Sequence, residues 1–123
     1  NSFLVDIPTH KLDLLLKLRE KYVVYLLSNT NQIHWDWTCI HLFPYRTFRV
    51  EDYFEKTYLS FEMKMAKPEP EIFKAIIEDA GIEPKETLFI DDSEMNCKAA
   101  QNLGIITYTA KAGEDWSHLF NSK

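Results

Sequence analysis

Three short segments of this sequence carry side chains suited to holding a phosphate group and a divalent cation. Ser28 and Asn29 follow one apolar run, and Asp91 and Asp92 end another. Lys67 lies between them, in a Lys-Pro-Glu-Pro segment. Two adjacent carboxylates repel each other unless a divalent cation neutralises them, and oxygen ligands of this kind suit Mg²⁺. A hydroxyl and an ammonium beside such a cation predict an electrostatic site for phosphoryl transfer.

Each of these residues also has an ordinary structural explanation. Ser28, Asn29 or Asp92 can cap a following helix, and Lys67 can be a solvated loop cation. The position of the three segments favours a shared site. Each segment follows a predicted strand, and the chemistry of parallel α/β sheets lies beyond the carboxyl ends of the strands.

The chain alternates predicted helices and strands, which indicates a parallel sheet covered on both faces. The run over 22–27 is apolar throughout, as in a strand buried on both sides. Pro70 and Gly81 mark the start and the end of one helix. We expect helices over 9–20, 31–41, 70–80 and 93–103, a helical turn over 50–54, and strands over 22–27, 57–60, 87–90 and 105–109.

Composition narrows the class of protein. The 123 residues suit one domain, and 14 Lys and Arg against 19 Asp and Glu give a formal net charge of −5. This balance argues against a nucleic-acid or membrane-surface partner. With 3 glycines, the chain has no glycine-rich phosphate loop. Cys39 and Cys97 show no metal-ligand spacing, so we expect reduced thiols in a cytoplasmic protein.

The three segments resemble motifs of the haloacid dehalogenase-like (HAD) hydrolases. Leu-Leu-Ser-Asn-Thr-Asn at 26–31, Lys-Pro-Glu-Pro-Glu-Ile-Phe at 67–73 and Leu-Phe-Ile-Asp-Asp-Ser-Glu-Met-Asn at 88–96 look like the second, third and fourth motifs, in the same order and at similar spacing. The form at 28–34 is similar to the branch that contains bacterial α-D-glucose-1-phosphate phosphatases. The resemblance implies a three-layer, Rossmann-like α/β core.

The resemblance also implies a role for each site residue. Ser28 would hydrogen-bond the phosphoryl group with help from Asn29. Lys67 would bridge that group and the nucleophilic carboxylate of the family. The expected substrate is a small phosphomonoester such as a sugar phosphate.

The acidic pair implies the cofactor. Asp91 and Asp92 would hold Mg²⁺, and Asn96 would support them from the next helical turn. Dehalogenating members of the superfamily have neutral residues in place of the acidic pair, so the pair points to a phosphatase. The family often has a glycine where this chain has Lys64; its ammonium either alters substrate preference or faces solvent.

The family's nucleophile is missing. Its first motif is a strand that ends in Asp-x-Asp, and no aspartate of this chain has another aspartate two residues later. Asp6 follows a short apolar run, but Pro8 takes the second carboxylate position. The segment around Asp6 resembles instead the return of the family's chain from its cap domain to its core.

These gaps define the expected domain. We expect residues 1–123 to be the C-terminal part of one HAD-like core, without its first, central strand and without its helical cap. A start at Asn1 rather than at a methionine agrees with a fragment, and such a fragment would be inactive alone. An open centre would leave two unpaired strand edges. They would pair with the missing N-terminal segment or exchange strands between copies.

Two other functions fit parts of the sequence. A response-regulator receiver domain has a similar length and similar residue types, but its acidic pair precedes its lysine. A non-catalytic module derived from the HAD core would bind phosphate or a partner without chemistry. An Asp-x-Asp encoded upstream of Asn1 would favour the enzyme over this module.

Overall fold

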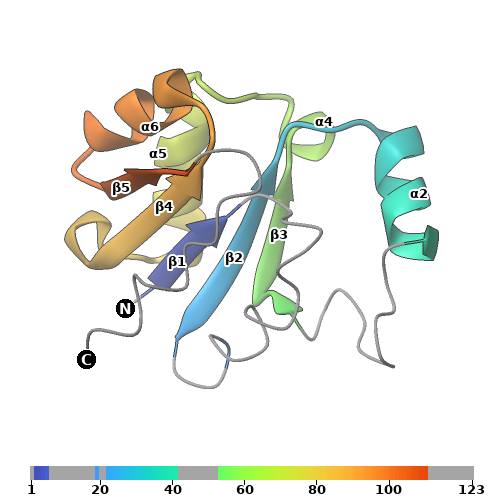
Figure 1. Ribbon diagram of the computed structural model, residues 1–123, viewed down its shortest axis with the longest axis horizontal. Helices are drawn as coiled ribbons and strands as arrows, with labels where there is room; N and C mark the ends of the chain where they lie inside the picture. The colour runs from blue at the N-terminus through green and yellow to red at the C-terminus, as the bar shows by residue number, and fades with distance from the viewer. Residues whose placement is uncertain (1, 6–18, 20–21, 42–52, 111–123) are drawn as a thin grey trace.

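The computed structural model describes residues 2–5, 19, 22–41 and 53–110 of the chain (Figure 1). Within them, one sheet of five parallel strands has the order β3-β2-β1-β4-β5. The predicted parallel α/β fold is therefore confirmed. The strands are β1 (Ser2–Val5), β2 (Val23–Ser28), β3 (Lys56–Leu59), β4 (Thr87–Asp91) and β5 (Ile106–Thr109).

The centre of the sheet is occupied by β1. Val5 pairs with Leu26 of β2 on one side and with Ile90 of β4 on the other. The expectation of an open gap is therefore wrong, because this apolar segment satisfies both edges and buries its own side chains. β1 does not end in the Asp-x-Asp that the resemblance implies for a central strand, because no aspartate of the sequence has another aspartate two residues later.

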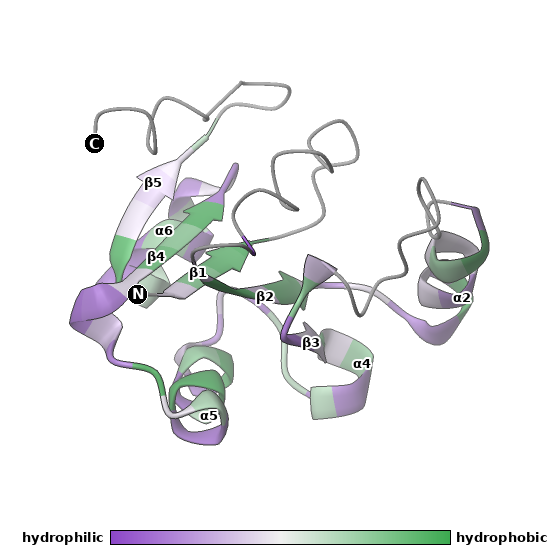
Figure 2. Cartoon of the chain, turned by 90° about the horizontal axis from the view of Figure 1, so that it is seen from below, coloured by the Kyte–Doolittle hydropathy of each residue, from purple (hydrophilic) through white to green (hydrophobic). Residues whose placement is uncertain are grey.

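The three central strands β1, β2 and β4 are largely buried on both faces, as the apolar run of β2 predicts. Phe3 and Val5 of β1 belong to one buried cluster with Leu26, and Leu4 belongs to a second cluster with Leu27. This alternation follows from the period of two along a strand. Figure 2 shows the hydrophobic strands at the centre of the described chain.

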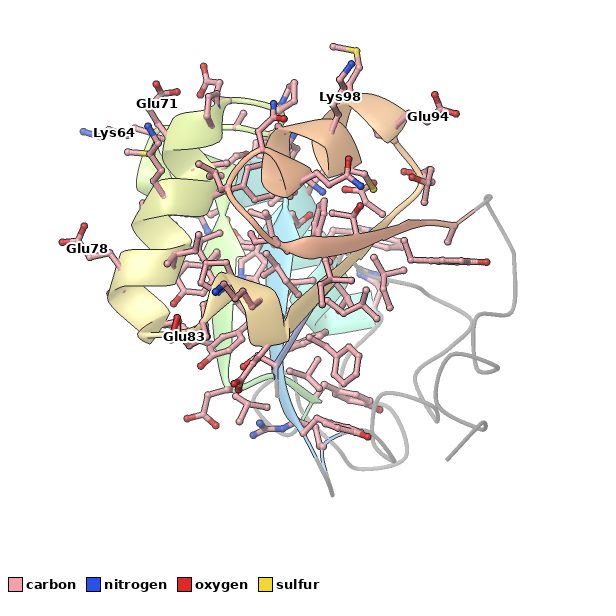
Figure 3. The ribbon with its side chains drawn as sticks, turned by 90° about the vertical axis from the view of Figure 1, so that its left-hand side faces the viewer. Lys64, Glu71, Glu78, Glu83, Glu94 and Lys98 are labelled. Atoms are coloured by element: carbon pink, nitrogen blue, oxygen red, sulfur yellow. The ribbon has the colours of Figure 1, made fainter. Side chains whose placement is uncertain are left out.

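Two helices cover the second cluster. They are α5 (Pro70–Ala80) and α6 (Glu94–Gln101), which bury Phe73 and Cys97 respectively among the strand side chains. Charged side chains of both helices point away from the sheet (Figure 3). As predicted, α5 has Pro70 in its first turn and ends at Gly81 in the left-handed conformation, with φ 67°.

One helix lies to one side of the sheet, and its Trp35 packs against the first cluster. α2 (Gln32–His41) has no buried residue and projects to one side of the molecule in Figures 1 and 2. Its Ile33, Trp37 and Ile40 are all exposed, and Trp37 stacks on His41. In the described part of the chain, no helix has the length and apolar character that crossing a membrane requires.

The predicted elements agree with the structure to within one or two residues wherever both are described. The structure adds three short elements, which are the strand β1, the helix α4 (Ser60–Met63) and the 3-10 helix η1 (Pro84–Glu86). The helix predicted over 9–20 lies almost wholly outside the described residues. Most of the helical turn predicted over 50–54 also lies outside the described residues.

Candidate active site

The predicted site residues gather at the carboxyl end of the sheet. Ser28 is the last residue of β2 and Asp91 is the last residue of β4, and β1 lies between these two strands. Lys67 reaches the same edge from the loop between α4 and α5. Ser28, Lys67 and Asp91 are all buried, which is unusual for polar residues and indicates a specific arrangement.

Lys67 and Asp91 form a buried ion pair. Lys67 Nζ lies 2.8 Å from Asp91 Oδ2, and their side chains are 2% and 3% exposed. Lys67 Nζ also donates to the carbonyl oxygen of Leu27 at 3.4 Å. Burial alone would raise the pKa of Asp91, but the Lys67 ammonium holds this pKa below its usual value. Lys67 is therefore no solvated loop cation.

Two neighbours of the next helix orient the carboxylate. The Ser93 main-chain N–H donates to Asp91 Oδ1 at 3.1 Å, and Asn96 Nδ2 donates to Asp91 Oδ2 at 3.1 Å. The Ser93 hydroxyl accepts from the Asn96 N–H and caps α6. Asn96 thus lies where the sequence places a supporting residue, one helical turn after the acidic pair.

Asn29 lies against Lys67, which sequence reasoning did not foresee. The side chain of Asn29 donates from Nδ2 to the Lys67 carbonyl oxygen at 3.1 Å. It also accepts from the Lys67 N–H at Oδ1, at 3.0 Å. The observed partner of Asn29 is the main chain of the site lysine, and its assistance to Ser28 at the phosphoryl group stays a prediction.

A second pair of hydrogen bonds joins the same two segments. The Ser60 hydroxyl accepts from the Thr30 N–H and donates to the Thr30 carbonyl oxygen, both at 2.9 Å. Asn31 caps α2 by accepting the His34 N–H at Oδ1, at 2.9 Å. Neither Ser28 nor Asn29 is needed for that cap.

The acidic pair fits a magnesium ion by its chemistry. Asp91 offers a buried carboxylate, and the adjacent Asp92 is exposed at the surface. In the part of the chain that the structure describes, no third carboxylate, histidine or cysteine completes a cluster. Mg²⁺ commonly takes one or two carboxylates and fills its other positions with water and a substrate phosphate, so two carboxylates suffice.

Lys64 stands beside the site loop in a left-handed conformation, with φ 57° and ψ 33°. Glycine adopts this conformation most easily, which explains why the family often has glycine here. The Lys64 side chain points away from the sheet (Figure 3). It borders an open hollow of about 300 Å³, whose other lining residues are Ser60, Phe61, Met65, Ala66 and Glu69. The solvent-facing alternative for Lys64 therefore agrees with the structure.

The sequence matches the haloacid dehalogenase-like hydrolase family over residues 3–104. It is 41% identical over 115 residues to the D-ribitol-5-phosphate phosphatase of Bacteroides thetaiotaomicron. That alignment covers 94% of this chain and 56% of the relative.

Solved structures agree with this match. A HAD-family enzyme of Bacteroides thetaiotaomicron, crystallised with magnesium and inorganic phosphate, is 84% identical with a TM-score of 0.89. The comparison covers 94% of this chain and 59% of that one. A HAD-like hydrolase of Porphyromonas gingivalis is 36% identical with a TM-score of 0.83. That comparison covers 93% of this chain and 58% of the hydrolase. The chain thus spans a little over half the length of these relatives.

Proposed function

Because this chain belongs to the haloacid dehalogenase-like hydrolase family, we propose that the whole protein is a Mg²⁺-dependent phosphatase. Its substrates are small phosphomonoesters such as sugar phosphates. The observation that carries the proposal is the buried pair of Lys67 and Asp91 beside Ser28 at one edge of the sheet. The magnesium and phosphate bound by the 84% identical enzyme support the same cofactor and the same ligand class.

The residues of this chain divide the work of binding the phosphoryl group. The Ser28 hydroxyl donates a hydrogen bond to a phosphoryl oxygen, and the Lys67 ammonium offsets the charge that develops there. Asp91 and Asp92 would hold Mg²⁺, which neutralises phosphate charge when it is bound. Asn96 and the Ser93 N–H fix the Asp91 carboxylate, so that little reorganisation accompanies binding.

The covalent step needs a nucleophilic carboxylate. The family's nucleophile lies in an Asp-x-Asp motif, and this chain has no such motif. In the proposed reaction, an aspartate outside these 123 residues attacks phosphorus, and the phosphorus bond to the leaving alcohol breaks. Water then hydrolyses the aspartyl phosphate, with a second acidic residue transferring the protons. In the whole protein, the strand that carries this aspartate would take the centre of the sheet in place of β1.

For the substrate, we favour a phosphorylated polyol or sugar. The support is the 41% identical relative, a D-ribitol-5-phosphate phosphatase that this chain covers over 56% of its length. D-ribitol 5-phosphate is therefore the first substrate to test on the whole protein, with α-D-glucose 1-phosphate as the comparison. Preference for a different class of ester would contradict this choice while leaving the phosphatase activity intact.

The test begins with the 123-residue chain and a chromogenic phosphomonoester in the presence of Mg²⁺. We expect no turnover from this chain and Mg²⁺-dependent turnover from a longer polypeptide that includes an upstream Asp-x-Asp. Strong activity of the short chain that Asp6→Ala abolishes would overturn the proposal of an external nucleophile.

The alternative function is a non-catalytic phosphate-binding module. It is favoured by the assembly of Ser28, Lys67 and Asp91 at one edge without an Asp-x-Asp. Binding of inorganic phosphate by the short chain agrees with both functions. Absence of turnover from every longer polypeptide would leave the module as the function.

A further inference from the structure

We propose that Asn29 is a positioning residue, which places the Lys67 ammonium by holding the main chain of Lys67. The inference rests on the proposed function in one respect, which is the action of the Lys67 ammonium on the phosphoryl group. The role of Asn29 itself follows from contacts within the chain. Asn29 and Lys67 are 38 residues apart, and two hydrogen bonds of 3.0 and 3.1 Å join them.

The contact imitates a pair of β-bridge hydrogen bonds. Two strand residues can exchange an N–H and a carbonyl in both directions, and the carboxamide of Asn29 does the same toward Lys67. A carboxamide presents this donor and acceptor side by side. Serine, aspartate and glutamine cannot reproduce the pair at the same reach at neutral pH. The contact therefore explains the need for asparagine at position 29.

A second joint limits the movement of the lysine loop. Ser60 exchanges two hydrogen bonds with the peptide groups of Thr30, which directly follows Asn29. Four hydrogen bonds thus tie the segment after β2 to the loop that begins at α4. Since Ser28 precedes this segment and Lys67 lies in the loop after α4, these bonds hold the hydroxyl-bearing and ammonium-bearing segments together.

Fixing the main chain matters because a lysine side chain is long and flexible. Ordering such a side chain costs rotamer entropy. Lys67 Nζ already has partners in Asp91 and the Leu27 carbonyl. With the main chain also fixed, both ends of the side chain are defined before a phosphate arrives. A site organised in this way needs little rearrangement on binding.

The competing explanation is a direct contact between Asn29 and phosphate, through the second proton on Nδ2. Hydrogen exchange separates the two explanations. In Asn29→Ala, the amide proton of Lys67 loses its acceptor, and we expect its protection to fall about tenfold, as the loss of one hydrogen bond implies. The amide of Ile90 in β4 serves as the internal reference and should not change.

Asn31→Ala is the matched control. It removes a side chain two residues further along, one that caps α2 instead of touching Lys67. Lys67 protection should be unchanged in this variant. An equal loss in both variants would mean general loosening of the segment and would overturn the inference.

Asn29→Asp provides a second test, the pH dependence of Lys67 protection, which a general structural role of residue 29 would not change. The ionised carboxylate accepts from the Lys67 N–H but cannot donate to the Lys67 carbonyl oxygen. At neutral pH the second carboxylate oxygen repels the Lys67 carbonyl oxygen, so Lys67 protection should be partly lost. A protonated carboxyl can do both, so the protection should recover as the pH falls through the pKa of the introduced group, ordinarily about 4. Protection that does not depend on this titration would contradict the two-way contact.

Binding of inorganic phosphate with Mg²⁺, followed by phosphorus NMR on the same variants, completes the experiment. We expect Asn29→Ala to weaken binding about tenfold together with the loss of Lys67 protection. Weaker binding with unchanged protection would show a direct phosphate contact and overturn the inference. If the unaltered chain binds no phosphate, the phosphate-binding roles proposed for Ser28 and Lys67 in this chain are contradicted, and the exchange data alone decide the role of Asn29.

Discussion

Lys67 Nζ donates a 2.8 Å hydrogen bond to Asp91 Oδ2, and both side chains are shielded from solvent. Two residues 24 apart in the sequence therefore neutralise each other at the predicted metal-binding edge. Their pairing explains how the chain buries an ammonium and a carboxylate at an edge that lacks the family's Asp-x-Asp. It also makes this edge sensitive to the loss of either charge.

Lys67→Met should destabilise the chain by about 3–5 kcal/mol at neutral pH, because it leaves the Asp91 carboxylate buried without its cation. Chemical denaturation monitored by circular dichroism measures the change. Lys56→Met is the control, since the pair of Lys56 with Asp79 is about half exposed and exposed ion pairs contribute little to stability. Similar losses in the two variants would show that burial of the Lys67 pair is unimportant.

The same pair predicts a compensating double variant. Adding Asp91→Asn to Lys67→Met removes the unpaired charge and should restore part of the lost stability. The free energies of unfolding of both single variants and the double variant form the cycle. Strictly additive losses would contradict direct coupling between the two side chains.

Lys64→Gly should stabilise the chain by roughly 0.5–1 kcal/mol. The left-handed conformation of Lys64 strains a residue with a Cβ, and glycine relieves this strain at a smaller entropic cost. Lys64→Ala removes the ammonium but keeps the strain, so it should change stability little.

Gly81→Ala tests the same principle in reverse. A Cβ at position 81 meets no atom within 4 Å, so a loss of about 1 kcal/mol would come from its φ of +67° alone.

Cys97 should react with a thiol reagent far more slowly than Cys39. Cys97 is buried and Cys39 is partly exposed, and burial raises the pKa of the Cys97 thiol above its usual value. At neutral pH, Cys97 therefore carries less of the reactive thiolate. Reaction kinetics of the Cys39→Ser and Cys97→Ser variants separate the two sites, and denaturant should abolish the difference. Equal rates in the folded chain would contradict the placement of Cys97.

Tyr58 should ionise later than an ordinary tyrosine. Burial raises its pKa, and the hydrogen bond from its hydroxyl to Asp79 Oδ2 at 2.7 Å raises it further. A raised pKa stabilises the fold below the ordinary value of 10.0, and this contribution is lost as the pH rises through the raised value. The difference in ultraviolet titration between the chain and Tyr58→Phe reports this group. Asp79→Asn should lower the pKa of Tyr58 only in part, because burial remains.

Asp79 titrates at the opposite end of the pH range. Hydrogen bonds from Lys56 and Tyr58 lower its pKa, so its contribution is present above the ordinary value of 3.8. The contribution disappears as the pH falls through the lowered value. Unfolding of the chain and of Asp79→Asn at acidic and neutral pH should therefore converge at the acidic end. A difference that persists there would show that the Asp79 charge is not its cause.

The long elements are predictable from the sequence because their patterns are regular. The apolar run of β2 and the stripe that buries Ile72 and Ile76 in α5 each extend over more than one period. α4 is four residues long, too short to show a helical repeat. β1 also has four residues, and its apolar side chains are equally compatible with a helix or a connection. The pairing that makes it a strand is tertiary.

The same distinction holds for the site. Ser28, Lys67 and Asp91 were predicted from the residues that follow strands, and the structure brings them to one edge. The contact of Asn29 was not predicted, because its partner is a peptide group 38 residues away and no sequence pattern reports such a contact. The carbonyl of Leu27 as a partner of Lys67 was missed for the same reason.

The position of β1 also sets the distance between the two strands on either side of it, β2 and β4. Ser28 ends the strand on one side of β1, and Asp91 ends the strand on the other. Because neighbouring strands lie about 4.8 Å apart, the hydroxyl-bearing and carboxylate-bearing strands are separated by about 9.6 Å. One strand is thus the spacer that sets the width of this edge. Any segment that replaces β1 at the centre inherits the same spacing, so the edge keeps its dimensions whichever strand fills it.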